Sequence, residues 1–555
     1  MPAATSHAER YRQVAVVLTR HGLGAIAGVS GLDRWAALRH LVGGSGGGDD
    51  RRGNPERLRI ALEELGTTFI KLGQLLSTRS DLLPPEYIAE LSKLQTDAPP
   101  VPIEVARGVI AEELGGPPES LFATFDPVPL ASASIGQAHA ATLHDGTRVV
   151  VKIRRPHVIE EVSLDLEVMQ NLAAQASRHW DLAADFNLVG LAAEFARTFR
   201  AELDYLHEAR NAERFARNFA GDPHIHIPRV IWETTTSRVI TLERIDGLGV
   251  SDIDGLDLEG IDRTQLVARA VGAIAKMVFA DGFFHADPHP GNLFVEADGR
   301  IGLIDFGMAA VIDRPLRELI SDLFIALTRK DPARIATAVM KLSVARRPVD
   351  REALVADLAQ FISMYRGQSL GEIRVAPLIT RVLAILRGHH LQLQPEMITL
   401  LRMLLMVEGM GVRLDPAFSL GEALGPYAAE LTLERYSPRY LAKRMAQAGA
   451  EAVELSAALP ERIRKLIDLI DTNGVEVHLR AAELDPLVAR VERIGNRLVA
   501  GVIAAAFIRG IGELAGGDGS PWRAWSGRLM GAGLTVTGIL SGYLALTSRR
   551  KRGRR

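Results

Sequence analysis

The 555-residue chain contains no cysteine, which excludes disulfide bonds, thiolate catalysis and cysteine-ligated metals. Its charges nearly cancel, with 65 Lys and Arg against 67 Asp and Glu, so no overall basic character predicts nucleic-acid binding. No P-loop Gly-Lys-Ser/Thr motif is present, which argues against a P-loop ATPase. Arg10, Arg12 and Arg20 interrupt any apolar run near the start, so we expect no secretory signal peptide.

The length of 555 residues is enough for two or three domains, and the hydrophobic fraction of 47% excludes disorder as the dominant state. Hydrophobic periodicity predicts one or two amphipathic helices in residues 1–41, then a glycine-rich linker at 43–50. Helical spacing returns over 55–96, with a break at Pro84-Pro85. A proline-rich crossing and a short helix at 103–114 follow.

The period changes to two from Phe125 onward, which indicates strands. The predicted strands are Phe125–Pro129, Gln137–Thr142, Arg148–Ile153, 228–233 and 238–243. Helices are expected at 158–178 and 187–219, and the chain reads as mostly helical from 263 to 470. A small β-rich lobe, a connector and a helical lobe are the order of a bilobal protein kinase.

The most informative motif is His285-Ala-Asp-Pro-His-Pro-Gly-Asn292, followed by Asp305-Phe-Gly307. Protein-kinase-like phosphoryl transfer uses this order of residues. Asp287 would lie near the nucleophile, while Asn292 and Asp305 would bind Mg²⁺ through hard oxygen ligands. The motif therefore predicts ATP and Mg²⁺ as cofactors. The alternative is that these residues only form turns.

His285 and His289 flank Asp287 in this motif. A metal site there is conceivable, but the sequence shows no third ligand. We therefore favour structural roles for both histidines within the catalytic loop.

Lys152 lies in the predicted strand Val149–Ile153, where a kinase lysine bridges the α- and β-phosphates of ATP. The alternative is an exposed strand lysine. Its carboxylate partner should lie on a following helix, and Glu202, Asp204 and Glu208 are the candidates. Asp204 and Glu208 are four residues apart and would share a helix face.

Residues 131–138 stand where a kinase has its glycine-rich loop, yet only Gly136 remains there. The other residues of the loop restrict φ more than glycine does, so nucleotide preference or phosphate positioning should differ. We expect the stretch Ala131, Ser132, Ala133 and Ser134 to contact ATP. By composition alone, Lys71 and Gln74 would be ordinary surface residues.

The C-terminal region reads as membrane-bound, because Leu529–Thr547 contains no charged residue over nineteen positions. With the apolar stretch from Leu498, it would form a transmembrane hairpin ahead of a basic tail. Gly538 and Gly542 form a GxxxG motif, which allows close helix approach and a possible homodimer. The alternative is a buried helix pair in a soluble domain.

Together these motifs resemble the UbiB/AarF atypical kinase family, also called the ADCK or Coq-type kinase-like proteins. Lys71-Leu-Gly-Gln74 is similar to the family's KxGQ signature, Ala131–Ser134 to its Ala-rich loop, and Glu202-Leu-Asp204 to its ExD motif. Glu208 matches the helix-C glutamate. Ser132 departs from the pattern, since the family often has Ala there.

The resemblance implies a lid over the active site, with Lys71, Gln74, Glu202 and Asp204 as its regulatory residues. Family members are associated with ubiquinone and other prenyl-quinone biosynthesis, and they act at membranes. They behave more as ATPases or small-molecule kinases than as protein kinases. No Ala-Pro-Glu motif follows Gly307, which is consistent with a non-protein substrate.

We therefore predict an α+β, bilobal kinase-like fold with an N-terminal helical extension and a C-terminal transmembrane hairpin. The predicted domains are 1–54, 55–120 (the KxGQ extension), 121–247 (N-lobe), 248–490 (C-lobe) and 495–555 (membrane anchor and basic tail). Asp287, Lys152 and Glu208 would act in catalysis, with Glu243 and Ile245 in the adenine-side hinge. The positive-inside rule places the kinase domain on the cytoplasmic face of the inner membrane.

The expected partners are membrane lipid and prenyl-quinone intermediates or biosynthetic enzymes, with no nucleic acid. Two other functions stay open. The first is a protein kinase that phosphorylates Ser or Thr of a partner. The second is a nucleotide-gated lipid-binding scaffold with little turnover.

Overall fold

The computed structural model describes residues 7–21, 54–77, 83–94, 99–179, 188–345, 348–365 and 374–427. The chain divides into two compact units, Met1–Leu431 and Thr432–Arg555, and every described residue belongs to the first. The predicted membrane hairpin, the GxxxG motif, the glycine-rich linker and the predicted helices beyond 427 thus lie outside the described residues. Within the described segments, no helix combines the length and apolar character needed to cross a bilayer.

The described N-terminal region is helical, as its periodicity predicts. Its helices are α1 (His7–Arg20), α4 (Asn54–Leu65), α5 (Thr67–Ser77) and α6 (Pro85–Leu91). Helices α4, α5 and α6 pack on one another around Leu62, Phe69 and Leu91, which are all buried. Pro84 is the N-cap of α6 and stands in extended backbone, as is typical of a residue that precedes a proline.

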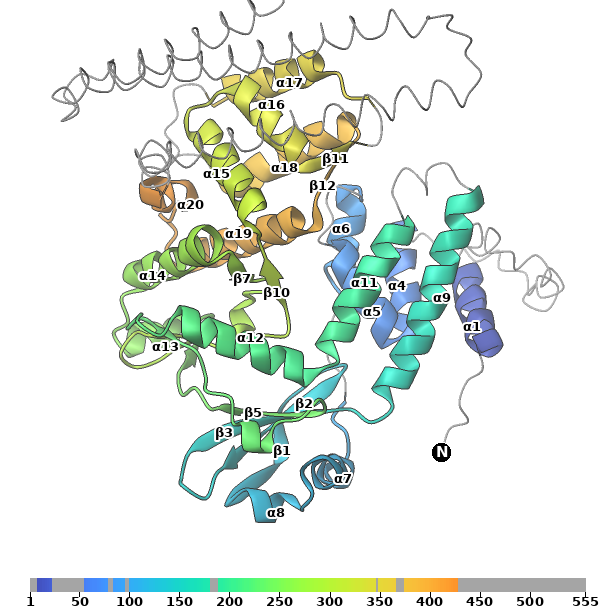
Figure 1. The fold of residues 1–555 in the computed structure, drawn as a ribbon, viewed down its shortest axis with the longest axis vertical. Helices are drawn as coiled ribbons and strands as arrows, with labels where there is room; N and C mark the ends of the chain where they lie inside the picture. The colour runs from blue at the N-terminus through green and yellow to red at the C-terminus, as the bar shows by residue number, and fades with distance from the viewer. Residues whose placement is uncertain are drawn as a thin grey trace, which may run out of the picture. The chain divides into compact units, whose positions relative to one another are not determined.

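The N-lobe is a four-stranded antiparallel sheet in the order β1-β2-β3-β5 (Figure 1). Its strands are β1 (Thr124–Ser132), β2 (Gly136–Thr142), β3 (Arg148–Arg154) and β5 (Val239–Glu243), with helices α7 (Ile103–Leu114) and α8 (Pro118–Leu121) beside it. Alternation along β3 buries Val149, Val151 and Ile153 in the lobe's core. Lys152 therefore projects from the other face of the sheet.

Three helices, α9 (Val158–His179), α11 (Leu188–Glu202) and α12 (Tyr205–Asn218), separate β3 from β5. The prediction of one continuous helix over 187–219 is wrong, because the chain leaves the helix at Leu203 and Asp204. Asp204 adopts extended backbone and its side chain accepts a hydrogen bond from Leu206 N at 3.0 Å. Aspartate favours such N-cap positions, so it starts a second helix with a new direction.

The predicted strand at 228–233 is also wrong. The chain there forms a single bridge from Val230 to Leu242, then a short 3₁₀ helix η2 (Trp232–Thr234). The Thr235 hydroxyl donates to Ile231 O and the Thr241 hydroxyl to Thr234 O. Side chains thus satisfy backbone groups that a strand ladder would otherwise pair.

The C-lobe is mostly helical through residue 427, as predicted. Its helices are α13 (Ile253–Leu258), α14 (Arg263–Ala275), the π-helix η3 (Lys276–Asp281), α15 (Arg314–Thr328), α16 (Pro332–Lys341), α17 (Arg351–Ser363), α18 (Val375–Gly388), α19 (Pro395–Leu414) and α20 (Leu420–Ala423). Aspartate N-caps define several starts, namely Asp252, Asp262, Asp313, Asp331 and Asp350.

Eight further short strands occur among the described residues and were not predicted from the sequence; six of the eight lie in the region from 263 onward that was predicted to be mostly helical. They are β4 (Ile225–His226), β6 (Leu248–Gly249), β7 (Phe283–His285), β8 (Leu293–Val295), β9 (Ile301–Leu303), β10 (Ala309–Val311), β11 (Ser343–Ala345) and β12 (Leu391–Leu393). Strands β8 and β9 pair antiparallel with Leu293 opposite Leu303. This register brings Asn292, just before β8, close to the segment after β9 that contains Asp305.

A substitution at Gly73 in α5 would test how tightly the N-terminal helices pack. A Cβ atom there would lie 2.3 Å from Leu94 Cδ1 and 2.8 Å from Leu62 Cδ1, and both leucines are buried. We expect Gly73→Ala to lower the free energy of unfolding by about 1–3 kcal/mol through overpacking. Urea unfolding measures this change.

Gly108→Ala is the matched control, because Gly108 lies inside α7 and a Cβ there meets nothing within 4 Å. Replacing a helical glycine with alanine should stabilise the protein by about 0.5–1 kcal/mol. Equal effects of the two variants would contradict the packing account.

Candidate functional site

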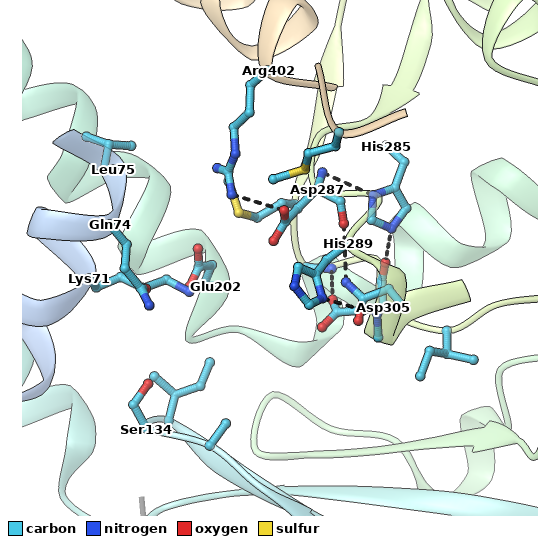
Figure 2. Close-up of a pocket in the computed structure, with 18 of the residues that line it drawn as sticks. Lys71, Gln74, Leu75, Ser134, Glu202, His285, Asp287, His289, Asp305 and Arg402 are labelled. Atoms are coloured by element: carbon cyan, nitrogen blue, oxygen red, sulfur yellow. Dashed lines mark hydrogen bonds and ion pairs between the residues drawn. The ribbon is translucent and has the colours of Figure 1, made fainter. Parts of the chain in front are cut away.

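The motif residues converge on one cavity of about 1620 Å³. The N-lobe sheet, the N-terminal helices α5 and α6, and helices α11, α12, α18 and α19 all contribute to its walls. The residues with candidate chemistry that line it are Lys71, Gln74, Lys152, Glu202, Glu208, Glu243, Ile245, Asp287, Asn292 and Asp305. Figure 2 shows Lys71 and Glu202 on one side of this space, with Asp287 and Asp305 on the other.

Lys152 on β3 contacts Glu208 on α12, with 2.5 Å between Lys152 Nζ and Glu208 Oε1. Burial alone would lower the pKa of Lys152, but the negative charges of Asp305 and Glu208 raise it above its ordinary value. Burial raises the pKa of Glu208, which Lys152 partly offsets. Of the three candidate carboxylates, Glu208 is thus the one that contacts Lys152. The positive charge of Lys152 favours the ionised form of Glu208.

Asp305 lies 3.9 Å from Lys152, measured from Oδ2 to Nζ, and its Oδ1 accepts from Gly307 N at 2.9 Å. Burial opposes the ionisation of Asp305, yet the Lys152 charge and the Gly307 N–H outweigh it and lower the pKa. Asp305 is therefore an ionised carboxylate facing the cavity. Asn292 donates from its amide nitrogen to Asp287 O at 3.2 Å, which leaves its amide oxygen available.

His285 holds the catalytic loop against the Asp305 segment. Its Nδ1 accepts from Asp287 N at 3.1 Å, so the proton lies on Nε2, which donates to Asp305 O. Burial lowers the pKa of His285 and keeps the ring neutral in this arrangement. The His289 Nδ1 accepts from Gly291 N. Both contacts agree with the structural roles expected for these histidines.

An aromatic cluster packs α12 against the segments that carry the site residues. Phe215 on α12 lies 4.5 Å from Phe283 on β7 and 5.4 Å from Phe306, measured between ring centroids. Phe306 is fully buried, and its carbonyl accepts from the Asn211 amide on α12. The helix that carries Glu208 is thus packed directly on the segment that carries Asp305.

The loop that replaces a glycine-rich loop is held by Arg155. Its guanidinium donates to Ala133 O at 2.9 Å, to Ser132 Oγ at 3.0 Å and to Pro99 O at 2.7 Å. Ala131, Ala133 and Ser134 line the cavity, but Ser132 does not. The Ser132 hydroxyl instead accepts from Arg155, which sequence reasoning did not identify.

The four predicted lid residues have different surroundings. Lys71 Nζ lies 2.9 Å from Glu202 Oε2, and the Gln74 amide donates to Leu94 O at 3.0 Å. Burial would lower the pKa of Lys71, but the charges of Glu202, Asp305 and Asp287 raise it. Asp204 does not line the cavity, because its side chain caps α12.

The predicted hinge residues lie at the end of β5. Glu243 and Ile245 both line the cavity, and Ile245 packs its side chain against Gly302 on β9. A Cβ at Gly302 would lie 2.7 Å from Ile245 Cγ2, so the close approach requires glycine. The Glu243 carboxylate accepts from Arg229 N at 3.2 Å.

Sequence reasoning missed Arg402 on α19. Its Nη2 donates to Asp287 Oδ1 at 3.0 Å, so a C-lobe helix contacts the residue expected near the nucleophile (Figure 2). One signal was available in the sequence. Arg402 is the single charge in the otherwise apolar run Ile398–Val407, and an isolated charge on such a helix face calls for a partner.

The sequence profile of the ABC1 atypical kinase-like domain matches residues 93–339, and that of the UbiB helical domain matches residues 358–419. The probable protein kinase UbiB of Xanthomonas oryzae pv. oryzae is 32% identical over 511 residues, which cover 90% of this chain and 92% of that protein. The chain belongs to the UbiB family of atypical kinase-like proteins.

The uncharacterized protein sll1770 of Synechocystis sp. is 34% identical over 447 residues, which cover 80% of this chain and 76% of that protein. Among solved structures, the erythromycin complex of Rv3197 from Mycobacterium tuberculosis is 26% identical. It covers 66% of this chain and 94% of that one, with a TM-score of 0.45.

The donor set of this UbiB-family site fits Mg²⁺. Asp305 is an ionised carboxylate and Asn292 has an unused amide oxygen, and both are hard ligands on one cavity wall. Among the described residues, no three His, Cys, Asp or Glu side chains are grouped to hold a metal by themselves. Mg²⁺ commonly completes its coordination with phosphate and water rather than with further protein ligands.

The neutral state of His285 predicts a pH dependence for this UbiB-family fold. Because the folded pKa is depressed, the stabilising contribution is present above the unfolded pKa of about 6.5 and is lost as the pH falls through the folded pKa. We expect the free energy of unfolding to fall over this window. His285→Asn should reduce the pH dependence, as measured by urea unfolding between about pH 8 and pH 5. An identical pH profile in the variant would contradict this assignment.

Proposed function

We propose that this chain binds Mg-ATP and transfers or hydrolyses its γ-phosphoryl group, as an atypical kinase or ATPase. The observation that carries the proposal is the convergence of Lys152, Glu208, Asp287, Asn292 and Asp305 on one cavity. These residues come from β3, α12 and two separate C-lobe segments. Turn formation alone does not account for this arrangement of a charged lysine beside an ionised aspartate.

Each residue has a distinct role in the proposed reaction. Lys152, held by Glu208, binds the α- and β-phosphates, while Ala131, Ala133 and Ser134 approach the phosphates from the N-lobe. Asn292 and Asp305 hold Mg²⁺, which neutralises charge on the phosphoryl oxygens when bound. Asp287 orients the nucleophile and takes its proton. Glu243 and Ile245 lie on the adenine side.

The N-terminal helices that line the cavity favour a non-protein acceptor. Lys71 and Gln74 enter it from α5, and Lys71 pairs with Glu202 on α11. Only residues 308–313 separate Gly307 from the start of α15, which leaves little chain for an activation loop. These features support a small-molecule acceptor or water over a polypeptide. Phosphate transfer to a co-purified polypeptide would instead favour the protein-kinase alternative.

We further propose a role in ubiquinone or related prenyl-quinone biosynthesis at the inner membrane, with the kinase domain on the cytoplasmic side. Membership of the UbiB family and the apolar run Leu529–Thr547 support it. Membrane lipid and prenyl-quinone intermediates or enzymes are the proposed partners. The homodimer through Gly538 and Gly542 stays a prediction.

Asp305→Asn tests the chemistry directly. Loss of the metal-binding carboxylate should lower Mg²⁺-dependent phosphate release from ATP by about 10³-fold or more. The measurement uses detergent- or liposome-reconstituted protein, and Asp298→Asn is the control because Asp298 is an exposed turn residue. Retained turnover in Asp305→Asn would exclude the proposed role of this residue.

A measurement of nucleotide binding distinguishes the enzyme from the remaining alternative, the nucleotide-gated lipid-binding scaffold. If wild-type protein binds ATP without releasing phosphate, the nucleotide-gated lipid-binding scaffold is favoured over the enzyme. Lipid extraction that depends on the bound nucleotide would then support the scaffold.

The quinone role is tested in a bacterial strain that lacks its own UbiB-family protein. Expression of this chain should restore the quinone pool, because the proposed reaction supports its synthesis. Asp305→Asn should fail to do so at equal protein level. Quinones are quantified by chromatography of lipid extracts. Full restoration by the variant would separate the quinone role from phosphoryl transfer.

A further inference from the structure

The ion pair between Arg402 and Asp287 uses only part of the arginine's capacity. One N–H, on Nη2, donates to Asp287 Oδ1 at 3.0 Å. The Nε of Arg402 is buried and has no hydrogen-bond partner among the described residues. A guanidinium has five N–H donors and matches oxyanions with two parallel hydrogen bonds. Arg402 can therefore bind a second anionic group.

Arg402 is not needed to hold the catalytic loop. The Asp287 main chain is fixed by His285, which accepts from its N–H, and by Asn292, which donates to its carbonyl. Among the described residues, the hydrogen bond from Arg402 goes to the Asp287 carboxylate and not to its main chain. A nucleophile that approaches Oδ1 of this carboxylate would compete with the guanidinium for that oxygen.

The cavity wall around Arg402 is largely apolar. On α19 the lining residues are Ile398, Leu401, Arg402, Leu405 and Met406, and on α18 they are Ile379, Thr380, Leu383 and Arg387. The spacing within each helix places its lining residues on one face. Ile88 and Ala89 of α6 line the same cavity. Among the described residues, no side-chain partner of Arg387 is found.

This wall has the composition of a site for an amphipathic acid. Apolar side chains would contact the body of such a ligand, and guanidinium groups would bind a carboxylate or phosphate group. A partly buried guanidinium that gives up one carboxylate favours another anionic partner, because leaving the charge unpaired is costly. Exchange of Asp287 for a ligand anion satisfies this need.

We propose that Arg402, with Arg387, binds an anionic group of the phosphoryl acceptor, and that this exchange frees Asp287 for the acceptor hydroxyl. This inference rests on the proposed function. The acceptor is thus a hydroxyl compound with an apolar body and a carboxylate or phosphate group. Its hydroxyl oxygen attacks the γ-phosphorus of ATP, the bond to the bridging oxygen breaks, ADP leaves, and the hydroxyl proton passes to Asp287.

Two matched probes test the anion site, namely an octyl-substituted hydroxybenzoic acid and its methyl ester. Both contain the hydroxyl and the apolar body, but only the acid is anionic. Wild-type full-length protein with a non-hydrolysable ATP analogue should bind the acid roughly tenfold more tightly than the ester, by calorimetry. Equal binding of the two probes would overturn the proposal.

Variants show whether Arg402 is responsible. Arg402→Gln should lose the preference for the acid, with roughly tenfold weaker acid binding and little change for the ester. Arg402→Lys should keep part of the preference, because it retains the charge. Arg413→Gln is the control, since Arg413 is exposed in the last turn of the same helix. A merely structural role for Arg402 would weaken both probes equally and would overturn the proposal.

The rate of ADP formation from ATP separates this inference from the proposed function. If wild-type protein turns over ATP but the acid raises ADP formation no more than the ester does, only the acceptor site fails. If no ADP forms, the proposed function fails, and the binding preference still tests the anion site. Phosphatidylglycerol in phosphatidylcholine vesicles distinguishes the two sources of the anionic group, a lipid headgroup and a free acid. Stimulation by these vesicles that Arg402→Gln removes identifies a lipid headgroup, and stimulation by the acid alone identifies a free acid.

Discussion

The active-site arrangement depends on the contact between Lys152 and Glu208 beside Asp305. Three ionisable groups from β3, α12 and the segment after β9 meet in one partly buried place. Each would be unfavourable there alone, because burial penalises an isolated charge. Burial also penalises the charge of Lys152, but the attraction of both carboxylates outweighs this penalty, so the lysine stays charged. These ion pairs thus fix the N-lobe sheet and α12 relative to the segment that contains Asp305.

Apolar packing and hydrogen bonds make this electrostatic arrangement specific. Phe215 places α12 against Phe306, and His285 connects the loop of Asp287 to the Asp305 backbone. The side chains that ionise are therefore attached to elements that cannot shift independently. Rigid support of this kind is what positions catalytic groups for phosphoryl transfer. A ligand that rearranges the site is expected to act on side-chain pairs such as that of Arg402, rather than on the loops.

Much of the fold followed from local patterns. The alternation predicted at Arg148–Ile153 and the helical periods predicted at 103–114 and 158–178 correspond to observed elements, because these segments have one clearly apolar face. Predictions from local periodicity were wrong where a single side chain formed a hydrogen bond that interrupts the periodic element. Asp204 reads as part of a helix by spacing, yet it caps the next one. The short C-lobe strands of two or three residues have too few positions for any period to show.

The sequence by itself determined which chemical groups the site contains. Lys152, Asp287, Asn292 and Asp305 stand in short motifs, and within each motif the covalent chain fixes the number of residues between them. It also determined the family. Only the tertiary structure decided that Ser132 turns to Arg155 and that Arg402 reaches Asp287 from 115 positions away. The physical reason is that these contacts depend on how separate helices pack, which no local period encodes.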